Sequence, residues 1–142
     1  MIDARKYLEG IRSTRRRIHM KMKRVQSLRE SLTQITASMD KEQVSHTKNV
    51  GIMADTIAMI MDTEKEIQLQ TKELVAAKEE ANVLLEQIDP EYGSVLQAYY
   101  IEGEKIGQIV KELFISRRTV ERRLNAGLDV FQAFLNLRES SP

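Results

Sequence analysis

Apolar residues recur at every seventh position along two long stretches of the chain, and this repeat limits the fold more than any other feature. The repeat consists of Ala4, Ile11, Ile18, Val25, Leu32 and Met39, and then of Met53, Ile60, Ile67, Leu74, Ala81 and Ile88. A strict seven-residue repeat keeps one apolar seam of a helix turned toward a partner helix along its whole length. The sequence therefore predicts two long helices of the coiled-coil type.

Further apolar residues widen each seam. They are Tyr7, Leu8, Met22, Leu28 and Ile35 beside the first repeat, and Val50, Ile57 and Leu85 near the two ends of the second. We expect helices from about Asp3 to Ala37 and from about Gly51 to Gln87, with the polar, aperiodic segment 38–49 as a loop. The second helix would span roughly 55 Å at 1.5 Å per residue, which requires a long partner. That partner is either the first helix, folded back as a hairpin, or a second copy of the chain.

The remainder of the chain also indicates helices. No stretch rich in Val, Ile and Thr lies between turn residues, as a β-strand would. Asp89 before Pro90 is typical of a helix start, because Pro is tolerated at the first helical position and Asp caps it. We expect a helix from about Pro90 to Ile101, whose inward face consists of Val95, Leu96, Tyr99 and Tyr100. The sequence predicts an all-α fold.

Gly103 then breaks the chain, and two shorter helices follow, one over about Lys105 to Leu113 and one that starts at Ser116. Their apolar residues are spaced so that the two helices pack together: Ile106, Ile109, Val110 and Leu113 on the first, and Val120, Leu124 and Leu128 on the second. The apolar segment 130–135 is expected to pack on the helix over about Pro90 to Ile101 or on the long helices. The predicted domains are a coiled-coil hairpin over 1–88, a trihelical helix-turn-helix domain over 89–137, and a loose tail over 138–142.

The residues at the start of the last helix are the candidates for binding a partner. Ser116 can cap it by accepting a hydrogen bond from a backbone amide of the next turn. With Val120 and Leu124 turned inward, the outward residues are Arg117, Arg118, Glu121 and Arg122. The planar guanidinium of arginine can bond guanine O6 and N7 together or hold a phosphate. This layout is typical of a helix that enters the major groove of DNA. The plainer alternative is a trihelical domain with a solvated basic face.

The segment Tyr100-Ile101-Glu102-Gly103, followed after a spacer by Ile115-Ser116-Arg117-Arg118-Thr119-Val120-Glu121-Arg122-Arg123-Leu124, resembles region four of bacterial sigma factors. The chain over about 55–130 is similar to sigma-like proteins of unknown function encoded by phages and prophages of Gram-positive bacteria. The resemblance implies that the last helix recognises double-stranded DNA, with RNA polymerase as a partner. The DNA-binding residues that it implies are Arg117, Arg118, Glu121 and Arg122, flanked by Arg123, with Ser116 and Thr119 at the helix start and Lys105 and Lys111 on phosphates.

The chain departs from that family at two positions. Val110 stands where a small residue is usual, and Phe114 stands in the turn where Gly is usual. Since Phe adopts a positive φ only at a cost, we expect a different turn geometry. Gly127 lies inside the last helix, where Gly costs about 1 kcal/mol relative to Ala, and it is expected to bend or end that helix.

The chain has a net charge of +1 but a strong charge asymmetry. Residues 1–30 carry ten Lys or Arg against three Asp or Glu, and residues 31–90 carry five against eleven. The basic run from Arg12 to Arg24 can bind phosphates or pair with the acidic second helix, and we favour pairing. The methionines cluster in the first 61 residues, where a core or a dimer interface is favoured over a peptide-binding groove.

Several function classes are not expected. There is no cysteine, so no disulfide or thiolate site, and the charged N-terminus argues against a signal peptide. The most apolar window, 50–61, is too short to span a membrane. His19 and His46 have no second ligand at helical spacing, and no phosphate loop or nucleophile motif is present. We therefore expect a cytoplasmic protein that is not an enzyme, with no metal, no cofactor and no small-molecule substrate.

The sequence thus favours a sequence-specific DNA-binding transcription regulator that forms a homo-oligomer through its long helices. A second interpretation is an assembly or DNA-packaging protein, like a small terminase subunit, that binds DNA with little specificity. A third is an interaction module whose trihelical part binds only protein. A specific regulator is expected to favour its site over random DNA by roughly 10³-fold or more, whereas a packaging protein is expected to show a steep salt dependence without preference.

Overall fold

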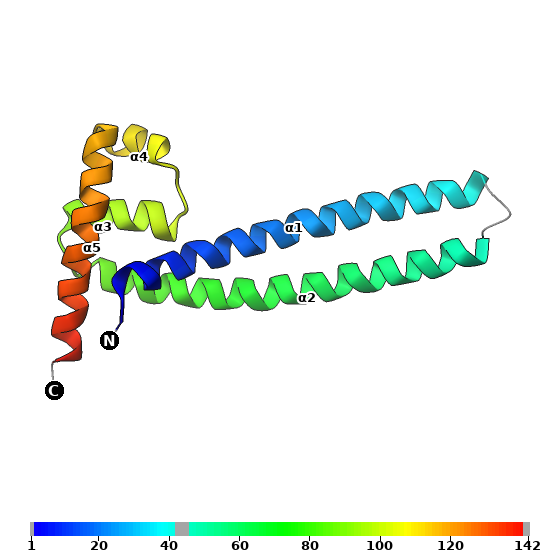
Figure 1. The fold of residues 1–142 in the computed structure, drawn as a ribbon, viewed down its shortest axis with the longest axis horizontal. Coiled ribbons are helices and arrows are strands. Elements are labelled where there is room, and N and C mark those ends of the chain that lie inside the picture. The colour runs from blue at the N-terminus through cyan, green and yellow to red at the C-terminus, as the bar shows by residue number, and fades with distance from the viewer. Residues whose placement is uncertain (1, 42–45, 141–142) are drawn as a thin grey trace. The chain divides into compact units, whose positions relative to one another are not determined.

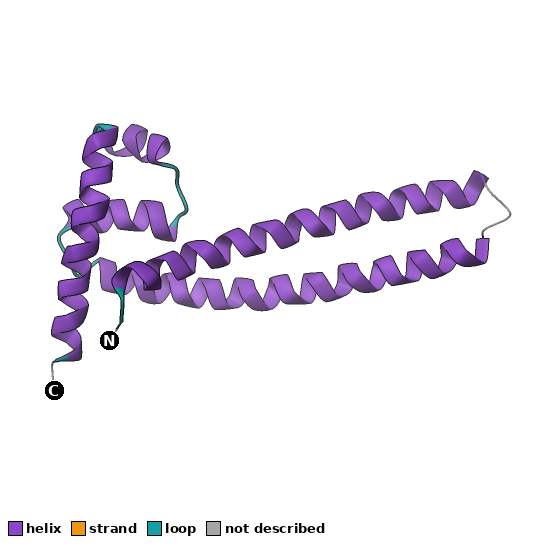
Figure 2. Ribbon diagram, in the orientation of Figure 1, coloured by secondary structure: helices purple, strands orange, loops and turns teal. Residues whose placement is uncertain are grey.

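The computed structural model describes residues 2–41 and 46–140. The elements in chain order are α1 (Ala4–Lys41), α2 (His46–Leu85), α3 (Pro90–Leu96), the π-helical turn η1 (Gln97–Ile101), α4 (Ile106–Leu113) and α5 (Arg117–Glu139) (Figure 1). No strand occurs in this part of the chain (Figure 2). The predicted all-α fold is confirmed.

The chain divides into two compact units. The core unit consists of Met1–Arg15 together with Leu74–Pro142, and the hairpin unit consists of Arg16–Glu73. The division therefore does not coincide with the predicted boundary after residue 88. The first turns of α1 and the last turns of α2 share a buried core with the C-terminal helices, so they belong to the core unit.

In the hairpin unit, α1 and α2 run side by side in opposite directions (Figure 1). An ion pair joins Lys21 Nζ to Glu66 Oε2 at 3.1 Å, and Arg29 pairs with Glu64. Of the two partners considered for the second long helix, the first helix of the same chain is thus the one that the structure contains. The Lys21–Glu66 pair also agrees with the prediction that part of the basic run 12–24 pairs with the acidic helix, whereas Arg29 lies outside that run.

The predicted seven-residue seam is buried or half-buried in the hairpin unit, with Ile18, Val25 and Ile60 each exposed by less than a tenth. The second line of the α2 seam was predicted wrongly in the hairpin unit, although its remaining member, Leu85 in the core unit, is buried. Val50 and Ile57 are 41% and 40% exposed, and Met22 on α1 is also exposed. The buried residues are instead Thr56 and Thr63, which lie three residues after the repeat members Met53 and Ile60. The predicted Ile57 lies four residues after Met53.

The two buried threonines need no polar partner across the seam. The hydroxyl of Thr56 donates to the carbonyl oxygen of Ile52, and that of Thr63 to the carbonyl oxygen of Met59, each at 2.8 Å. Because each hydroxyl bonds within its own helix, the side chain presents its methyl group to the seam at little polar cost. Threonine therefore serves here as a small apolar residue.

The predicted loop over 38–49 is wrong at both of its ends. Residues 38–41 continue α1 and residues 46–49 begin α2, while 42–45 and the side chain of Met39 lie outside the described part. The segment lacks an apolar repeat, but it also contains neither Gly nor Pro. At residues 38–41 and 46–49 nothing therefore stops a helix that the neighbouring turns have already formed.

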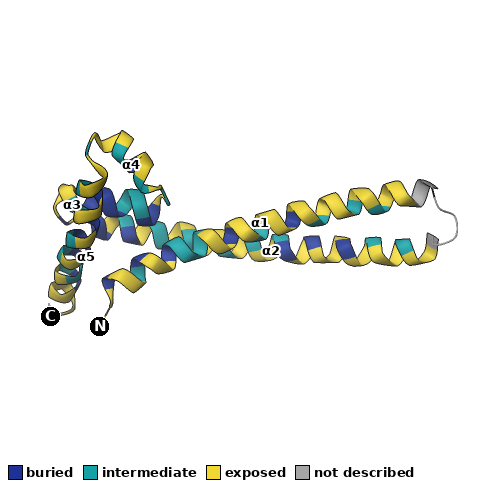
Figure 3. Cartoon of the chain, turned by 45° about the horizontal axis from the view of Figure 1, so that its top comes forward, coloured by how far each residue is buried: buried dark blue, intermediate teal, exposed yellow. Residues whose placement is uncertain are grey.

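The core unit buries one apolar cluster, shown in dark blue in Figure 3. At its centre Phe131 of α5 is fully buried, and its ring centroid lies 6.3 Å from that of Tyr7 of α1. The predicted packing of segment 130–135 on the preceding helices is confirmed. The other fully buried large side chains are Leu8, Leu85, Leu96, Ile101, Ile109, Val95 and Val120.

Helix α5 corrects two expectations. It runs through Gly127 without interruption, and a Cβ at that position would lie 3.3 Å from Leu96 and from Tyr92. Gly127 thus allows α5 to approach α3 closely instead of bending it. The predicted loose end at 138–142 is also wrong up to residue 140. Helix α5 extends to Glu139, whose Oε1 accepts a hydrogen bond from the amide of Ile2 at 2.9 Å, and residues 141–142 lie outside the described part.

Candidate nucleic-acid interface

Helix α4, a three-residue turn and α5 form the arrangement that the sequence predicted. Ser116 caps α5, since its Oγ accepts a hydrogen bond from the amide of Thr119 at 3.1 Å. Ile109 of α4 and Val120 of α5 are fully buried, and Leu124 and Leu128 are nearly so. This apolar contact fixes α5 against α4. Leu113, predicted to share the contact, is 37% exposed.

Phe114 occupies the left-handed region, with φ 56° and ψ 41°. The expectation that Phe would change this turn is therefore wrong, because Phe114 takes the conformation that glycine commonly takes after a helix. Its side chain is 92% exposed, so no packing offsets the strain. A left-handed conformation costs a non-glycine residue about 1–2 kcal/mol.

Four of the predicted DNA-contacting residues lie exposed at the start of α5: Arg117, Arg118, Glu121 and Arg122. Arg117 Nε lies 3.3 Å from Glu121 Oε1, with the two side chains 69% and 51% exposed. An exposed ion pair of this kind contributes at most about 1 kcal/mol, so Arg117 can exchange Glu121 for another anion. Arg118 and Arg122 stand one turn apart on the same side of the helix.

Two predicted residues are engaged elsewhere. Arg123 is half-buried, and its Nε lies 3.3 Å from Glu91 Oε1 of α3. It therefore helps to hold α5 on α3 and is not brought together with the exposed arginines. Thr119 is half-buried, and its Oγ1 lies 2.8 Å from Ser116 Oγ, so its side chain belongs to the helix cap.

Cationic side chains from three helices surround a hollow of about 560 Å³ in the core unit. We call it the cationic hollow, and its lining includes Arg12 of α1, Lys105 and Lys111 at the two ends of α4, and Arg117 of α5. No carboxylate of the described residues lines it. Lys105 gives α4 no side-chain cap, so the first amides of that helix add partial positive charge. A phosphate is the kind of group that such a site attracts.

Arg12 is the member of the cationic hollow that comes from the basic run 12–24, for which pairing with the acidic second helix was favoured over phosphate binding. Its guanidinium carbon lies 4.0 Å from the centroid of the Tyr99 ring, and its NH1 donates to the carbonyl oxygen of Tyr99 at 2.6 Å. The neighbouring Arg15 donates in the same way to the carbonyl oxygen of Ile101. These two arginines satisfy carbonyls at the end of η1 that would otherwise lack partners.

Gly103 allows this arrangement. It has a φ of +69°, and a Cβ at this position would lie 2.8 Å from Cδ of Arg15. The predicted break in the chain at Gly103 is confirmed, and its close approach to α1 is an additional reason for glycine.

Carboxylates gather on the chain beside the cationic hollow. Burial, and then the neighbouring Glu112 and Glu102, raise the pKa of Glu104 above its usual value. Glu102 Oε1 lies 3.8 Å from Lys78 Nζ. Because its pKa is raised, Glu104 takes up a proton at a higher pH than an ordinary carboxyl group does. Its repulsion with Glu102 and Glu112 is then relieved. Acidification is therefore expected to make the surroundings of the hollow more positive.

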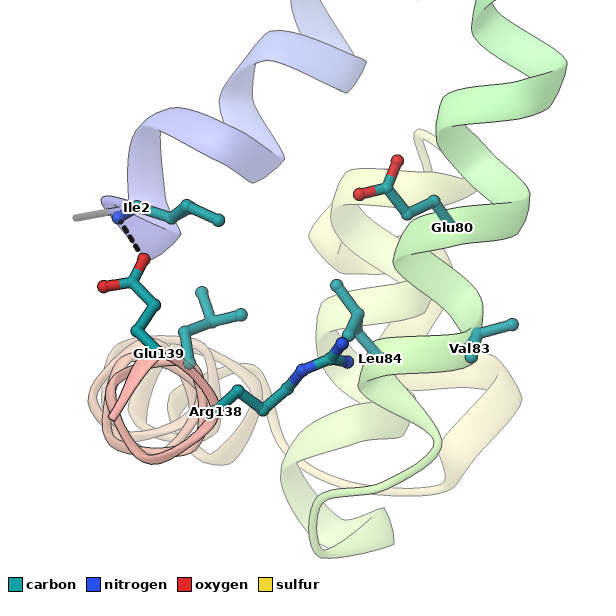
Figure 4. Close-up of a pocket in the computed structure, with 7 residues that line it drawn as sticks. Ile2, Glu80, Val83, Leu84, Arg138 and Glu139 are labelled. Carbon is teal, nitrogen blue, oxygen red and sulfur yellow. Dashed lines mark hydrogen bonds between the residues drawn. The ribbon is translucent and has the colours of Figure 1, made fainter. Parts of the chain in front are cut away.

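A second hollow, of about 460 Å³, has a different character (Figure 4). Arg138 and the carboxylates of Glu80 and Glu139 line it together with the apolar Ile2, Val83, Leu84 and Leu135. Glu139 faces the backbone amide of Ile2 there, and Arg138 extends across the opening toward Leu84 (Figure 4). With two acids and one base, this hollow does not favour a polyanion.

The described residues contain no group of three or more His, Asp or Glu side chains placed to hold a metal ion, and the side chain of His46 lies outside them. None of the described helices combines the length and the apolar character that crossing a membrane requires.

Comparison with known proteins gives one family. Residues 31–131 match the model of a family described as a protein of unknown function (DUF1492). No curated protein and no solved structure matches the chain.

Proposed function

We propose that this chain, which belongs to that family of proteins of unknown function, binds double-stranded DNA and regulates transcription. The cationic hollow is the observation that carries the proposal. It joins Arg12, Lys105, Lys111 and Arg117 without a lining carboxylate, next to the exposed Arg118 and Arg122 of α5. Duplex DNA offers the phosphates for the first group and base edges for the second.

In this proposal the residues of the hollow and the exposed arginines of α5 contact different parts of the duplex. The hollow and the first amides of α4 hold backbone phosphates and fix the position of the duplex. Arg118 and Arg122 extend from the first turns of α5, the part of a recognition helix that contacts bases in helix-turn-helix proteins. Glu121 can accept a hydrogen bond from a cytosine amino group or orient Arg117, which it already pairs with.

The resemblance to region four of sigma factors supports a narrower version of the proposal. On that basis the DNA site is a promoter element, RNA polymerase is the partner, and the regulator serves a phage or prophage programme.

The test is a selection from a pool of random-sequence duplexes, with retained fragments sequenced and affinities then measured over a range of salt. A specific regulator is expected to prefer the selected site over random duplex by roughly 10³-fold or more. Binding with a steep salt dependence and no preferred sequence would replace the regulator by a packaging-type protein. Absence of binding at low salt would remove DNA from the proposal altogether.

A further inference from the structure

The hairpin unit exposes large apolar side chains outside its seam. Five of them lie within twelve residues of α2, and we call them the apolar collar: Val50, Ile52, Ile57, Met59 and Met61. Each is between 40% and 54% exposed. In Figure 3 the two helices of this unit carry scattered buried and half-buried residues, and most of their other residues are exposed.

The collar surrounds α2 instead of extending its seam. Val50 and Ile57, seven residues apart, flank the buried Thr56 and Ile60 on one side, and Ile52 and Met59 flank them on the other. Together with the seam, they make the segment 50–61 apolar on nearly every side. A helix that is apolar all round is one whose every face is covered in the native assembly. Within the hairpin unit α1 covers only one of these faces.

Charge is nearly absent from this part of the unit. Within 50–61 only Asp55 is charged. The pairing of Arg29 with Glu64 and of Lys21 with Glu66 sets a register that brings residues 31–38 of α1 beside the collar. The exposed residues of that stretch are uncharged and mostly small: Ser31, Thr33, Gln34, Thr36, Ala37 and Ser38. The surface therefore lacks the charges that a partner of opposite sign would recognise.

We propose that the collar and the adjoining uncharged face of α1 form a dimer interface with a second copy of the same chain, so that two hairpin units make a four-helix bundle. A two-fold axis places the same surface on both sides of an interface, so an apolar, uncharged surface complements itself. Stable interfaces bury about 800 Å² per partner around an apolar centre. One flank of the collar, with the small uncharged side chains of α1 that adjoin it, supplies that centre.

The collar gives the expected oligomer a defined interface in the hairpin unit. It does not depend on DNA binding, because all of its residues lie in the hairpin unit, whereas the cationic hollow lies in the core unit. The exposed Met20 and Met22 of α1 and Leu69 of α2 lie further along the same unit and are not required for it.

Sedimentation equilibrium of the full chain over a hundredfold concentration range tests the proposal. The wild type is expected at twice the chain mass of 16.4 kDa. The double variant Ile57→Lys/Met59→Lys, with one change on each flank of α2, is expected to weaken the dimer by at least 100-fold. The matched control Gln68→Lys/Thr71→Lys adds the same two charges at exposed polar positions of α2 and is expected to remain dimeric.

Circular dichroism identifies a variant that has lost its helices. In that case Ile57→Gln/Met59→Gln replaces it, because Gln keeps helix propensity and adds no charge. This uncharged variant is also expected to shift the equilibrium toward monomer. A monomeric wild type throughout the range, or a dimer that survives both double variants, would overturn the proposal.

Discussion

The guanidinium of Arg12 lies over the ring of Tyr99 and also donates a hydrogen bond to the carbonyl oxygen of the same residue. A side chain of α1 thereby contacts both the ring and the backbone of a residue in η1, and it also lines the cationic hollow. One residue thus links the stability of the core unit to its charge.

Replacing Arg12 with Ala removes both contacts. We expect the free energy of unfolding to fall by about 1–2 kcal/mol, since an arginine over an aromatic ring and a charged hydrogen bond each contribute on that scale. We also expect weaker binding to every duplex, whatever its sequence. Urea denaturation and fluorescence titration with DNA measure the two effects. Arg16→Ala, at an exposed neighbour, is the control, and equal effects of both variants would contradict a special role of Arg12.

Replacing Arg118 or Arg122 with Ala is expected to weaken binding to the selected site by about 1–3 kcal/mol if the residue reads a guanine, with a smaller loss on random duplex. Arg138→Ala removes an exposed arginine from the last turn of the same helix and serves as the control. Titrations of both duplexes at one salt concentration give the comparison. Unchanged binding in both variants would exclude these arginines from the recognition surface.

Replacing Phe114 with Gly is expected to stabilise the protein by about 1 kcal/mol, because Gly adopts a positive φ without strain. The side chain is 92% exposed, so little packing is lost. Thermal and urea unfolding measure the gain. Phe114→Ala keeps the strain and is the control, and a destabilised Phe114→Gly variant would show that the ring makes contacts of its own.

Two helical glycines are expected to respond in opposite directions to Ala. A Cβ at Gly93 would lie 2.7 Å from the carbonyl oxygen of Leu85, so Gly93→Ala forces α3 away from α2 and is expected to cost about 1–3 kcal/mol. Gly10 has nothing within 4 Å of its Cβ position, so Gly10→Ala is expected to gain about 1 kcal/mol from helix propensity. Unfolding curves of the two variants, with unchanged helicity, provide the measurement. Effects of the same sign would contradict the close approach of α3.

Burial, and then the charge of Glu80, raise the pKa of Tyr7 from 10.0 to about 12. Because the raised pKa favours the neutral phenol in the folded state, its contribution to stability is present below pH 10 and is lost as the pH rises toward 12. Tyr7→Phe lacks this titration. The urea midpoint of the wild type is expected to fall relative to that of Tyr7→Phe as the pH rises from 10 toward 12. A constant difference between the two midpoints over this range would contradict the raised pKa of Tyr7.

The sequence predicted those features that depend on local patterns. The start of α3 at Pro90, the cap at Ser116 and the break at Gly103 follow from residue types with specific backbone preferences. The first line of each seam follows from its apolar repeat. The second line of α2 was missed within the hairpin unit, because Thr56 and Thr63 count as polar until their hydroxyls are seen to bond within the helix.

The candidate site was predicted in part. Exposure of Arg117, Arg118 and Arg122 follows from their positions relative to Val120 and Leu124 on one helix. Phosphate binding by the basic run that begins at Arg12 was one of two alternatives, but the contact of Arg12 with Tyr99 could not be predicted, because it joins residues 87 positions apart. The pairing of Arg123 with Glu91 has the same origin, since sequence alone does not reveal which side of α5 faces α3.

The π-helical turn at Gln97–Ile101 has a consequence for comparing this chain with its relatives. Its closing bond runs from the amide of Glu102 to the carbonyl oxygen of Gln97, five residues back, so the turn holds one residue more than an α-helix would. A relative that lacks a single residue here would form an ordinary helix and rotate everything after it by about 100°. Its arginines equivalent to Arg12 and Arg15 would then meet different carbonyls, so a one-residue gap in an alignment at this point would mark a change of architecture.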